Sequence, residues 1–220
     1  MFSEKWDVIY GNGEQLNEYP YNEVVSFFKR YKDQLSGKNA LDVGCGSGVH
    51  AVMLAKYGLS VTAFDASRVA VDYAIEKYQT YKNLRFIRST TTDFNADGMY
   101  DLVIDRLCTS QTGIFATKAF YESLYTKLNG GAYLFWQGFC SDNSGKKFAK
   151  THNTELGYWD EFTDGKFKNI GATTFYSDEN ISDIFSKYDI VEKYVYSMKN
   201  KINDYDHNYW QLVLKRPGIL

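Results

Sequence analysis

The sequence predicts an α/β fold of the doubly wound type, with helices on both faces of a mostly parallel sheet. Short apolar runs alternate with helical hydrophobic patterns along the chain. The first apolar run, Ala40–Val43, leads into a glycine-rich turn, and a helical pattern over Val49–Tyr57 follows at once. A chain of 220 residues, 44% of them hydrophobic, is long enough for a single domain over residues 1–220 with a substantial core.

The glycine-rich turn gives the first indication of a ligand. Residues 41–48 read Leu-Asp-Val-Gly-Cys-Gly-Ser-Gly. Gly44, Gly46 and Gly48 are spaced as G-x-G-x-G, whereas the dinucleotide fingerprint is G-x-G-x-x-G. Asp42 lies two residues before the first glycine, where its charge would oppose a pyrophosphate and would suit a ligand ammonium group. Both features disfavour an NAD-dependent oxidoreductase.

Residues 41–48 resemble the first motif of the class I S-adenosyl-L-methionine (SAM)-dependent methyltransferases, and the resemblance runs from about Gly37 to the end of the chain. It implies a Rossmann-like methyltransferase fold, with seven mostly parallel strands and a helical N-terminal cap. It also implies SAM as cofactor and methyl transfer to an oxygen or nitrogen of a small molecule, for example a sugar or nucleotide sugar. The alternative is a non-catalytic SAM-binding subunit of a partner enzyme, and an NAD-dependent oxidoreductase is less favoured.

The other elements are expected at regular intervals along the chain. The predicted strands lie at residues 40–43, 59–64, 84–87, 100–105, 132–136, 188–196 and 209–215, and the resemblance makes the last two an antiparallel pair. The predicted helices lie at residues 24–35, 49–57, 67–78, 115–128 and 177–187. Ser67 and Ser177 are the expected N-caps of two of these helices, and Asn129-Gly130-Gly131 is the expected turn before the fifth strand.

Residues 1–36 precede the first strand and form the expected N-terminal cap. In the methyltransferases that the chain resembles, such a segment covers the SAM pocket. The resemblance therefore implies that Trp6, Tyr10, Tyr19 or Tyr21 approaches the methionine part of SAM or the substrate. The alternative is that these aromatic side chains only pack the cap on the sheet.

Asp65 follows the second predicted strand, about 20 residues after Gly44. This interval is typical of an acid that accepts the hydroxyl groups of a ribose, and Ala66 lies beside it. The alternative role, an N-cap for the next helix, is weaker because Ser67 can serve as the cap. Asp42 also has two roles open, a contact with the ligand amino group and a buried acid that accepts backbone N–H groups.

A polar run follows the third predicted strand and ends in Asp93-Phe94. The resemblance implies that Asp93 accepts from the adenine amino group of SAM, and that Phe94 offers a backbone N–H and an apolar wall. Ser89-Thr90 stands where family members often carry Gly-Asp. The alternative is an Asx turn in an exposed loop.

The fourth predicted strand delivers Asp105-Arg106 to the edge where open α/β sheets bind ligands. By its resemblance to the family's fourth motif, Asp105 is expected near the transferred methyl group. Arg106 has two interpretations, an ion pair with Asp105 and a clamp for a substrate anion.

Residues 137–176 form the least regular part of the chain and the expected substrate-side insertion. His152, Tyr158, Trp159 and Asp160 are candidate substrate contacts, and His152 is the preferred general base. The alternative is a surface histidine on a mobile loop.

The expected site residues come from all of these segments. The catalytic candidates are Asp105 and His152, and the expected SAM contacts are Tyr10, Tyr19, Asp42, Gly44, Cys45, Gly46, Asp65, Ala66, Asp93, Phe94 and Asp105. No metal site is expected, because Cys45, Cys108 and Cys140 lack metal-ligand spacing. Reduced thiols are the expected state of these cysteines.

The composition narrows the classes of partner. A net charge of −2 gives no general attraction to nucleic acid. No apolar run is long enough to span a bilayer, and the N-terminus lacks the plan of a signal peptide. We therefore expect a cytoplasmic protein that acts on a small molecule, with neither nucleic acid nor membrane as partner. Monomer and dimer are both open.

Overall fold

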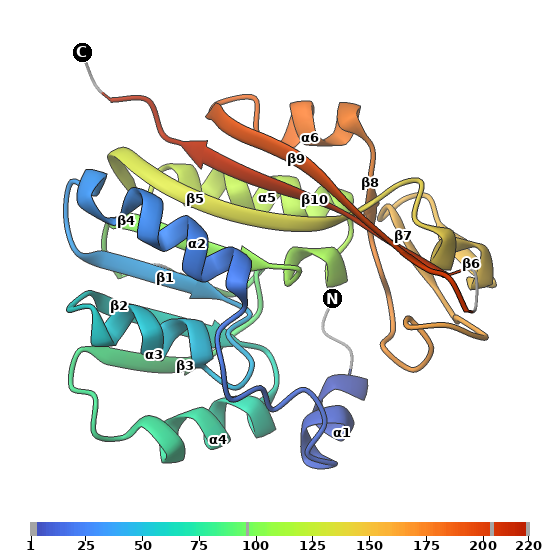
Figure 1. Cartoon of the computed structure of the whole chain (residues 1–220), viewed down its shortest axis with the longest axis horizontal. Coiled ribbons are helices and arrows are strands. Elements are labelled where there is room, and N and C mark those ends of the chain that lie inside the picture. Colours follow the sequence, from blue (N-terminus) through green and yellow to red (C-terminus); the bar gives the residue numbers. More distant parts are fainter. Residues whose placement is uncertain (1–3, 96, 203–204, 219–220) are drawn as a thin grey trace.

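A mixed sheet of eight strands lies between two layers of helices (Figure 1). The structure is a computed structural model that describes residues 4–95, 97–202 and 205–218. The strands follow the spatial order β3-β2-β1-β4-β5-β10-β9, and β8 pairs with the end of β5. Their bounds are β1 Asn39–Val43, β2 Ser60–Asp65, β3 Leu84–Arg88, β4 Tyr100–Arg106, β5 Leu128–Cys140, β8 Phe175–Tyr176, β9 Asp189–Asn200 and β10 Tyr205–Lys215.

Helices cover both faces of this sheet. Helices α2 and α3 share one apolar core with the sheet, and α5 and α6 share another on the opposite face. The helical bounds are α1 Lys5–Gly11, α2 Asn22–Tyr31, α3 Val49–Lys56, α4 Arg68–Tyr78, α5 Ile114–Tyr125 and α6 Asp178–Ile184, with short 3₁₀ helices at Lys32–Gln34, Thr109–Gln111 and Ser144–Phe148. Within the described ranges, none of the helices is long and apolar enough to cross a membrane.

The predicted doubly wound fold is confirmed, with one correction to the number of strands. The sheet has eight strands and not seven, because the two-residue β8 is too short to leave a hydrophobic pattern. Strands β1 to β5 run parallel, and β10 lies antiparallel between β5 and β9, as the predicted closing pair requires. The strand order reverses between β1 and β4, so a ligand crevice is expected at their carboxyl ends.

Strand β5 shows why the strands of this sheet have continuous apolar sequences. Successive side chains of a strand point to opposite faces. Phe135 packs on Phe27 of α2, with ring centroids 5.3 Å apart. Its neighbour Trp136 packs on Phe185, at the end of α6, also at 5.3 Å. Because both faces are covered, both alternating positions must be apolar.

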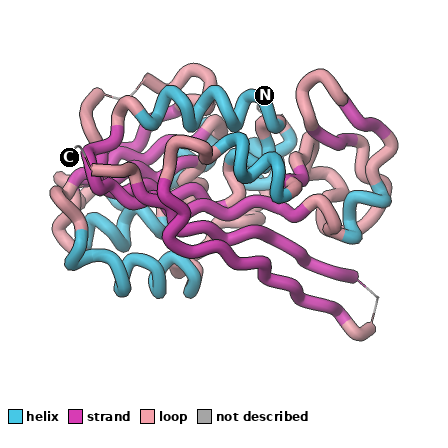
Figure 2. The backbone as a smooth tube through the Cα atoms, turned by 90° about the horizontal axis from the view of Figure 1, so that it is seen from above, coloured by secondary structure: helices cyan, strands magenta, loops and turns pink. Residues whose placement is uncertain are grey.

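Strands β5, β9 and β10 extend well beyond their predicted bounds. Asn129-Gly130-Gly131 lies inside β5 and not in a turn, because the N–H of Gly131 donates to the carbonyl of Arg216 at 2.9 Å and Leu128 pairs with Tyr100. Pairing on both sides thus extends β5 toward its N-terminus. Strands β9 and β10 continue beyond the sheet as an antiparallel ribbon that projects from the molecule (Figure 2).

The insertion over residues 137–176 is folded around a third apolar core. This core consists of the aromatic residues Phe139, Phe162, Phe167 and Phe175. The insertion also contains a small hairpin of β6 (Thr151–Asn153) and β7 (Tyr158–Asp160). Figure 1 shows it beyond the carboxyl ends of the parallel strands and beside the β9–β10 ribbon.

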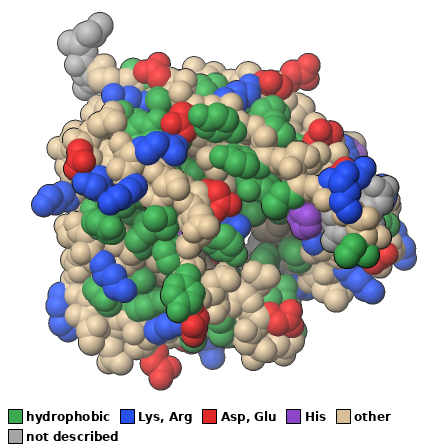
Figure 3. All heavy atoms as spheres, in the orientation of Figure 1, with side chains coloured by type: hydrophobic (Ala, Val, Ile, Leu, Met, Phe, Trp, Pro, Cys, Tyr) green, Lys and Arg blue, Asp and Glu red, His purple; other side chains and the backbone are tan. Residues whose placement is uncertain are grey.

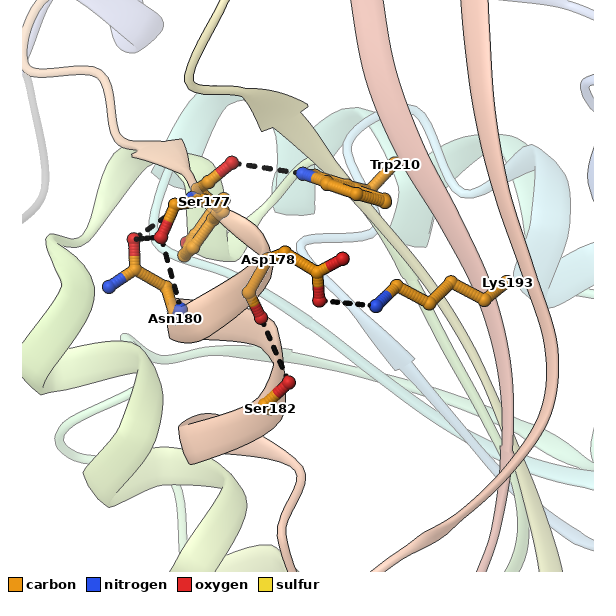
Figure 4. A network of polar contacts seen from close by, with 7 residues as sticks. Ser177, Asp178, Asn180, Ser182, Lys193 and Trp210 are labelled. Atoms are coloured by element: carbon orange, nitrogen blue, oxygen red, sulfur yellow. Dashed lines mark hydrogen bonds and ion pairs between the residues drawn. The ribbon is translucent and has the colours of Figure 1, made fainter.

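Helix α6 is fixed at its first turn by the network in Figure 4. The Ser177 hydroxyl accepts from the backbone N–H of Asn180 at 3.2 Å, and the Asn180 side chain accepts from the N–H of Ser177 at 2.9 Å. This reciprocal pair is a capping box, and it confirms Ser177 as the N-cap. The Asp178 carboxylate accepts from the ammonium group of Lys193 on β9 at 2.5 Å.

Replacing Ser177 with alanine should lower the free energy of unfolding by about 1 kcal/mol, because the N–H of Asn180 loses its acceptor. Ser182→Ala is the matched control on the same helix, since that exposed hydroxyl donates only to the Asp178 carbonyl at 3.0 Å. Urea denaturation of both variants measures the difference. Equal losses for the two variants would contradict the capping role.

Candidate active site

A cavity of about 470 Å³ opens at the carboxyl ends of β1, β2 and β4. Its walls come from the N-terminal segment, the glycine-rich turn, the loop after β4, and the insertion together with β10. Figure 3 shows the surface hollowed between hydrophobic side chains on the face that it presents. The cavity therefore lies in the crevice that the strand order leads us to expect.

The glycine-rich turn forms one wall of the cavity and admits only glycine. Gly44 and Gly46 have positive φ angles of 66° and 50°. A Cβ at Gly44 would collide with the side chain of Cys108, and a Cβ at Gly46 would lie 2.7 Å from the hydroxyl of Tyr10. The turn can thus bring its backbone close to a ligand where any side chain would intervene.

Asp42 lines this wall and is almost completely buried. Its Oδ2 has no hydrogen-bond partner among the described residues. Burial raises the pKa of Asp42 to about 7, and a backbone hydrogen bond from Ala51 only partly opposes this effect. An unpartnered buried acceptor fits a ligand that brings its own donor, such as an ammonium group.

Asp65 lies at the end of β2 and lines the same cavity. Its Oδ2 accepts from the N–H of Gly46 at 2.9 Å, and its Oδ1 accepts from the N–H of Ser67 at 2.8 Å. Burial raises the pKa of this carboxyl group. Ser67 is the N-cap of α4, through its bond from Ala70, as predicted. Each carboxylate oxygen keeps a second lone pair, so ribose hydroxyls can still donate to Asp65.

The N-terminal segment covers the cavity. Trp6, Tyr10 and Tyr21 line it, and the hydroxyl of Ser47 donates to the Asn17 carbonyl at 2.8 Å, which attaches the segment to the glycine-rich turn. Tyr19, which was expected to contact SAM, is not brought to the cavity.

Tyr19 is 79% exposed and absent from the cavity wall. Its position next to Pro20 in a bend before α2 turns the ring to solvent. Cys45 and Ala66, two of the other expected contacts, do line the cavity.

The structure does not bring Asp105 to the cavity, so its predicted catalytic role stays a prediction. This side chain is completely buried and is absent from the cavity wall. Its carboxylate accepts from the hydroxyls of Thr109 at 2.7 Å and Tyr121 at 2.5 Å and from the N–H of Cys108 at 2.9 Å. Burial nevertheless raises the pKa of Asp105 to about 6.

The alternation of strand β4 explains this result. Asp105 points toward α5, so its neighbour Arg106 points into the cavity. The two residues therefore do not form the ion pair considered from sequence. Asp105 instead holds the loop after β4, which carries Leu107 and Cys108 into the cavity wall.

The structure does not bring His152 to the cavity either, so its predicted role as general base stays a prediction. This exposed residue lies on β6, where its ring stacks on Trp159 with centroids 4.0 Å apart, and it does not line the cavity. The fold brings His50 and His207 to the cavity instead. His50 accepts from the N–H of Tyr21 at 3.4 Å through Nε2, and burial lowers its pKa to about 3.

Asp93 and Phe94 line an adjoining hollow and not the main cavity. The two hollows share Ala66, Ser89 and Thr90 in their walls. Thr90 donates to the Asp93 carboxylate at 2.5 Å. The Phe94 ring stacks on Phe64 of the main cavity, with centroids 4.3 Å apart. The predicted adenine contacts therefore stay a prediction for a ligand that extends from one hollow into the other.

The far end of the cavity contains residues that no sequence pattern indicated. They are Phe139 at the end of β5, Lys166, Phe167 and Ile170 in the insertion, and His207 on β10. His50, by contrast, had a local signal, because it lies in the first turn of the helix that follows the glycine-rich turn.

Comparisons with known proteins agree with this geometry. Residues 40–131 match a family model described as a methyltransferase domain. The ubiquinone biosynthesis O-methyltransferase of Rickettsia bellii is 33% identical over 107 residues, which are 46% of this chain and 44% of that protein. The match thus spans less than half the length of this curated relative.

Solved structures show the same fold over nearly the whole chain. A SAM-dependent methyltransferase of Methanosarcina mazei is similar with a TM-score of 0.70 over 91% of this chain and 100% of that chain, at 14% identity. The N-methyltransferase NodS of Bradyrhizobium japonicum, in complex with S-adenosyl-L-homocysteine, is similar with a TM-score of 0.67 over 98% of this chain and 100% of that chain, at 12% identity.

Residues 40–131 match a methyltransferase domain, and nearly the whole chain shares the fold of SAM-dependent methyltransferases. SAM is the cofactor of this class, and the residues present fit it. Asp42 would receive its ammonium group, and Asp65 would receive its ribose hydroxyls, beside backbone that Gly44 and Gly46 leave uncovered.

Gly44→Ala should weaken binding of S-adenosyl-L-homocysteine about 10-fold or more, because the new Cβ displaces Cys108 from the cavity wall. Gly58→Ala is the matched control, since Gly58 has a φ of 85° but no atom within 4 Å of an added Cβ. Both variants carry the strain of a positive φ, so calorimetric titration isolates the collision. Equal affinities in the two folded variants would refute this prediction.

Asp42→Asn should reduce the pH dependence of stability of the ligand-free protein. The pKa of Asp42 is raised from 3.8 to about 7, so its contribution is complete below pH 3.8 and is lost as the pH rises through 7. As the pH rises from 4 to 8, the free energy of unfolding of the variant should increase relative to that of the wild type by on the order of 2–4 kcal/mol. Urea denaturation at each pH measures this difference. The free energy of unfolding of Asp72→Asn, a change at an exposed site on α4, should depend on pH as that of the wild type does. Parallel profiles for Asp42→Asn and the wild type would refute the prediction.

Proposed function

We propose that the protein transfers the methyl group of SAM to an oxygen or nitrogen atom of a small molecule. The unpartnered carboxylate oxygen of Asp42 in the cavity wall carries this proposal. Leaving a buried acceptor without a donor costs free energy in the ligand-free protein. The ammonium group of the SAM amino acid part supplies that donor together with a positive charge, which a neutral ligand would not bring.

Methyl transfer depends on alignment of the acceptor with the methyl group and on exclusion of water more than on a reactive side chain. When bound, SAM supplies a methyl group on a cationic sulfur, and the sulfur keeps the bonding electron pair as the acceptor atom bonds to carbon. The walls of this cavity supply the enclosure. Tyr10 and Tyr21 come from the N-terminal segment, Leu107 follows β4, and Phe139 and Phe167 come from the third apolar core.

A base is needed only for some acceptors. A neutral amine attacks without one, whereas a hydroxyl group loses a proton during the transfer. His207 lines the cavity, and burial and the neighbouring Lys166 lower its pKa. Its Nδ1 lies 2.8 Å from the ammonium group of Lys166, so a neutral ring that accepts from Lys166 has its proton on Nε2 and no acceptor left. We therefore propose neither His207 nor His152 as the base.

We propose a small molecule as the acceptor, because the volume of the cavity lies in the range of small-molecule sites. A sugar or nucleotide sugar is the acceptor that we propose from the sequence, in a cytoplasmic enzyme. Which acceptor binds depends on the residues at the far end of the cavity.

Calorimetric titration with SAM, S-adenosyl-L-homocysteine and NAD tests the proposed cofactor. We expect micromolar binding of the first two and none of NAD. Asp65→Asn should weaken SAM binding about 10-fold to 100-fold, since the ribose loses a charged acceptor. Asp72→Asn removes a carboxylate on the exposed face of α4 and should bind SAM as the wild type does. Tight NAD binding would refute the proposal.

Catalysis is tested separately by conversion of SAM in the presence of an acceptor panel. Binding of SAM without conversion by any acceptor would favour the non-catalytic subunit. Gel filtration and turnover with candidate partner proteins would then distinguish an activating subunit from an enzyme whose acceptor is missing from the panel.

A further inference from the structure

The cavity carries opposite charges on its two sides. The strand order β2-β1-β4-β5-β10 places Asp65 and Asp42 on the side of β2 and β1. Arg106 at the end of β4 and Lys166 beside β5 and β10 lie on the other side. The two acids suit the ammonium group and the ribose of the cofactor, and its single carboxylate is the only anion that methyl transfer to a neutral acceptor would bring to the two cations.

Arg106 lacks an anion in contact. Its Nε is buried without a hydrogen-bond partner, and across the described ranges it takes part in no ion pair. The Tyr21 ring covers one face of the guanidinium group, with its centroid 3.2 Å from Cζ. Burial lowers the pKa of Arg106, and Tyr21 and Glu23 oppose this effect only in part. A cation in this position favours an anionic ligand.

Lys166 adds a second positive charge to the same side. Its ammonium group lies 4.7 Å from the ring centroid of Phe139 and 4.8 Å from that of Phe167. It also lies 2.8 Å from Nδ1 of His207. Both rings line the cavity, so the cationic side has flat apolar walls. Burial lowers the pKa of Lys166 to about 8, so its ammonium group is still mostly charged at pH 7.

We propose that the acceptor substrate carries a carboxylate or phosphate group, which Arg106 binds at this side of the cavity, while Phe139 and Phe167 contact its apolar part. A guanidinium group forms paired hydrogen bonds with either anion, and Lys166 increases the positive potential around it. The proposal rests on the proposed methyl transfer and narrows its acceptor. A nucleotide sugar carries such a group, whereas a neutral sugar does not.

Three probes that share one ring test the proposal, namely benzoate, phenyl phosphate and the neutral benzamide. Each is titrated by calorimetry into protein saturated with S-adenosyl-L-homocysteine. We expect at least one anion to bind about 10-fold or more tightly than benzamide, because it gains charge-assisted hydrogen bonds. The tighter of the two anions tells whether the group is a carboxylate or a phosphate.

Arg106→Gln should lose this preference for anions, and Arg106→Lys should keep part of it because the charge is retained. Lys147→Gln is the matched control, since it removes an exposed cation of the insertion outside the cavity. Affinity for S-adenosyl-L-homocysteine should be the same in all variants and reports that each is folded.

Three results would overturn the proposal. They are equal binding of the three probes, an anion preference that survives Arg106→Gln, and failure of both anions to bind a protein that binds S-adenosyl-L-homocysteine. Failure of the wild-type protein to bind S-adenosyl-L-homocysteine would instead refute the proposed function. The anion preference of the ligand-free protein would then still decide the role of Arg106.

Discussion

The geometry of the site depends on the hydrogen bond between the Asp65 carboxylate and the backbone N–H of Gly46. It joins the end of β2 to the turn after β1, and the second oxygen of Asp65 fixes the N–H of Ser67 at the start of α4. The Ser67 hydroxyl in turn donates to Asp7 of α1 at 2.5 Å. One carboxylate thus sets the glycine-rich turn, the next helix and, through Ser67, the segment that covers the cavity.

Three aspartates at the ends of neighbouring strands show how donors decide the role of an acid. Asp105 has hydroxyl and backbone donors around both oxygens and is a structural group. Asp65 has one backbone donor on each oxygen and remains in the cavity wall. Asp42 has an oxygen with no donor and a pKa near 7. The acid with the fewest internal partners has the most to gain from a ligand.

The parts that sequence predicted well are those set by neighbours in the chain. The glycine-rich turn, the N-cap Ser67 and the strand ends at Asp42 and Asp65 follow from local spacing. The placement of Asp105 away from the cavity could not be predicted, because the direction of its side chain depends on which face of the sheet α5 covers. His207 and its neighbours could not be predicted, because strand pairing between distant segments brings them to the cavity.

The acidic side of the cavity and the apolar part of its cationic side belong to different stretches of the chain. The glycine-rich turn, both acids and Arg106 lie within residues 40–131, whereas Phe139, Lys166, Phe167 and His207 follow that segment. Under the proposed function, selection for cofactor binding and selection for binding of the apolar part of the acceptor therefore act on separate regions of the gene. The residues after 131 can then change to suit a new acceptor while the earlier segment keeps its cofactor contacts.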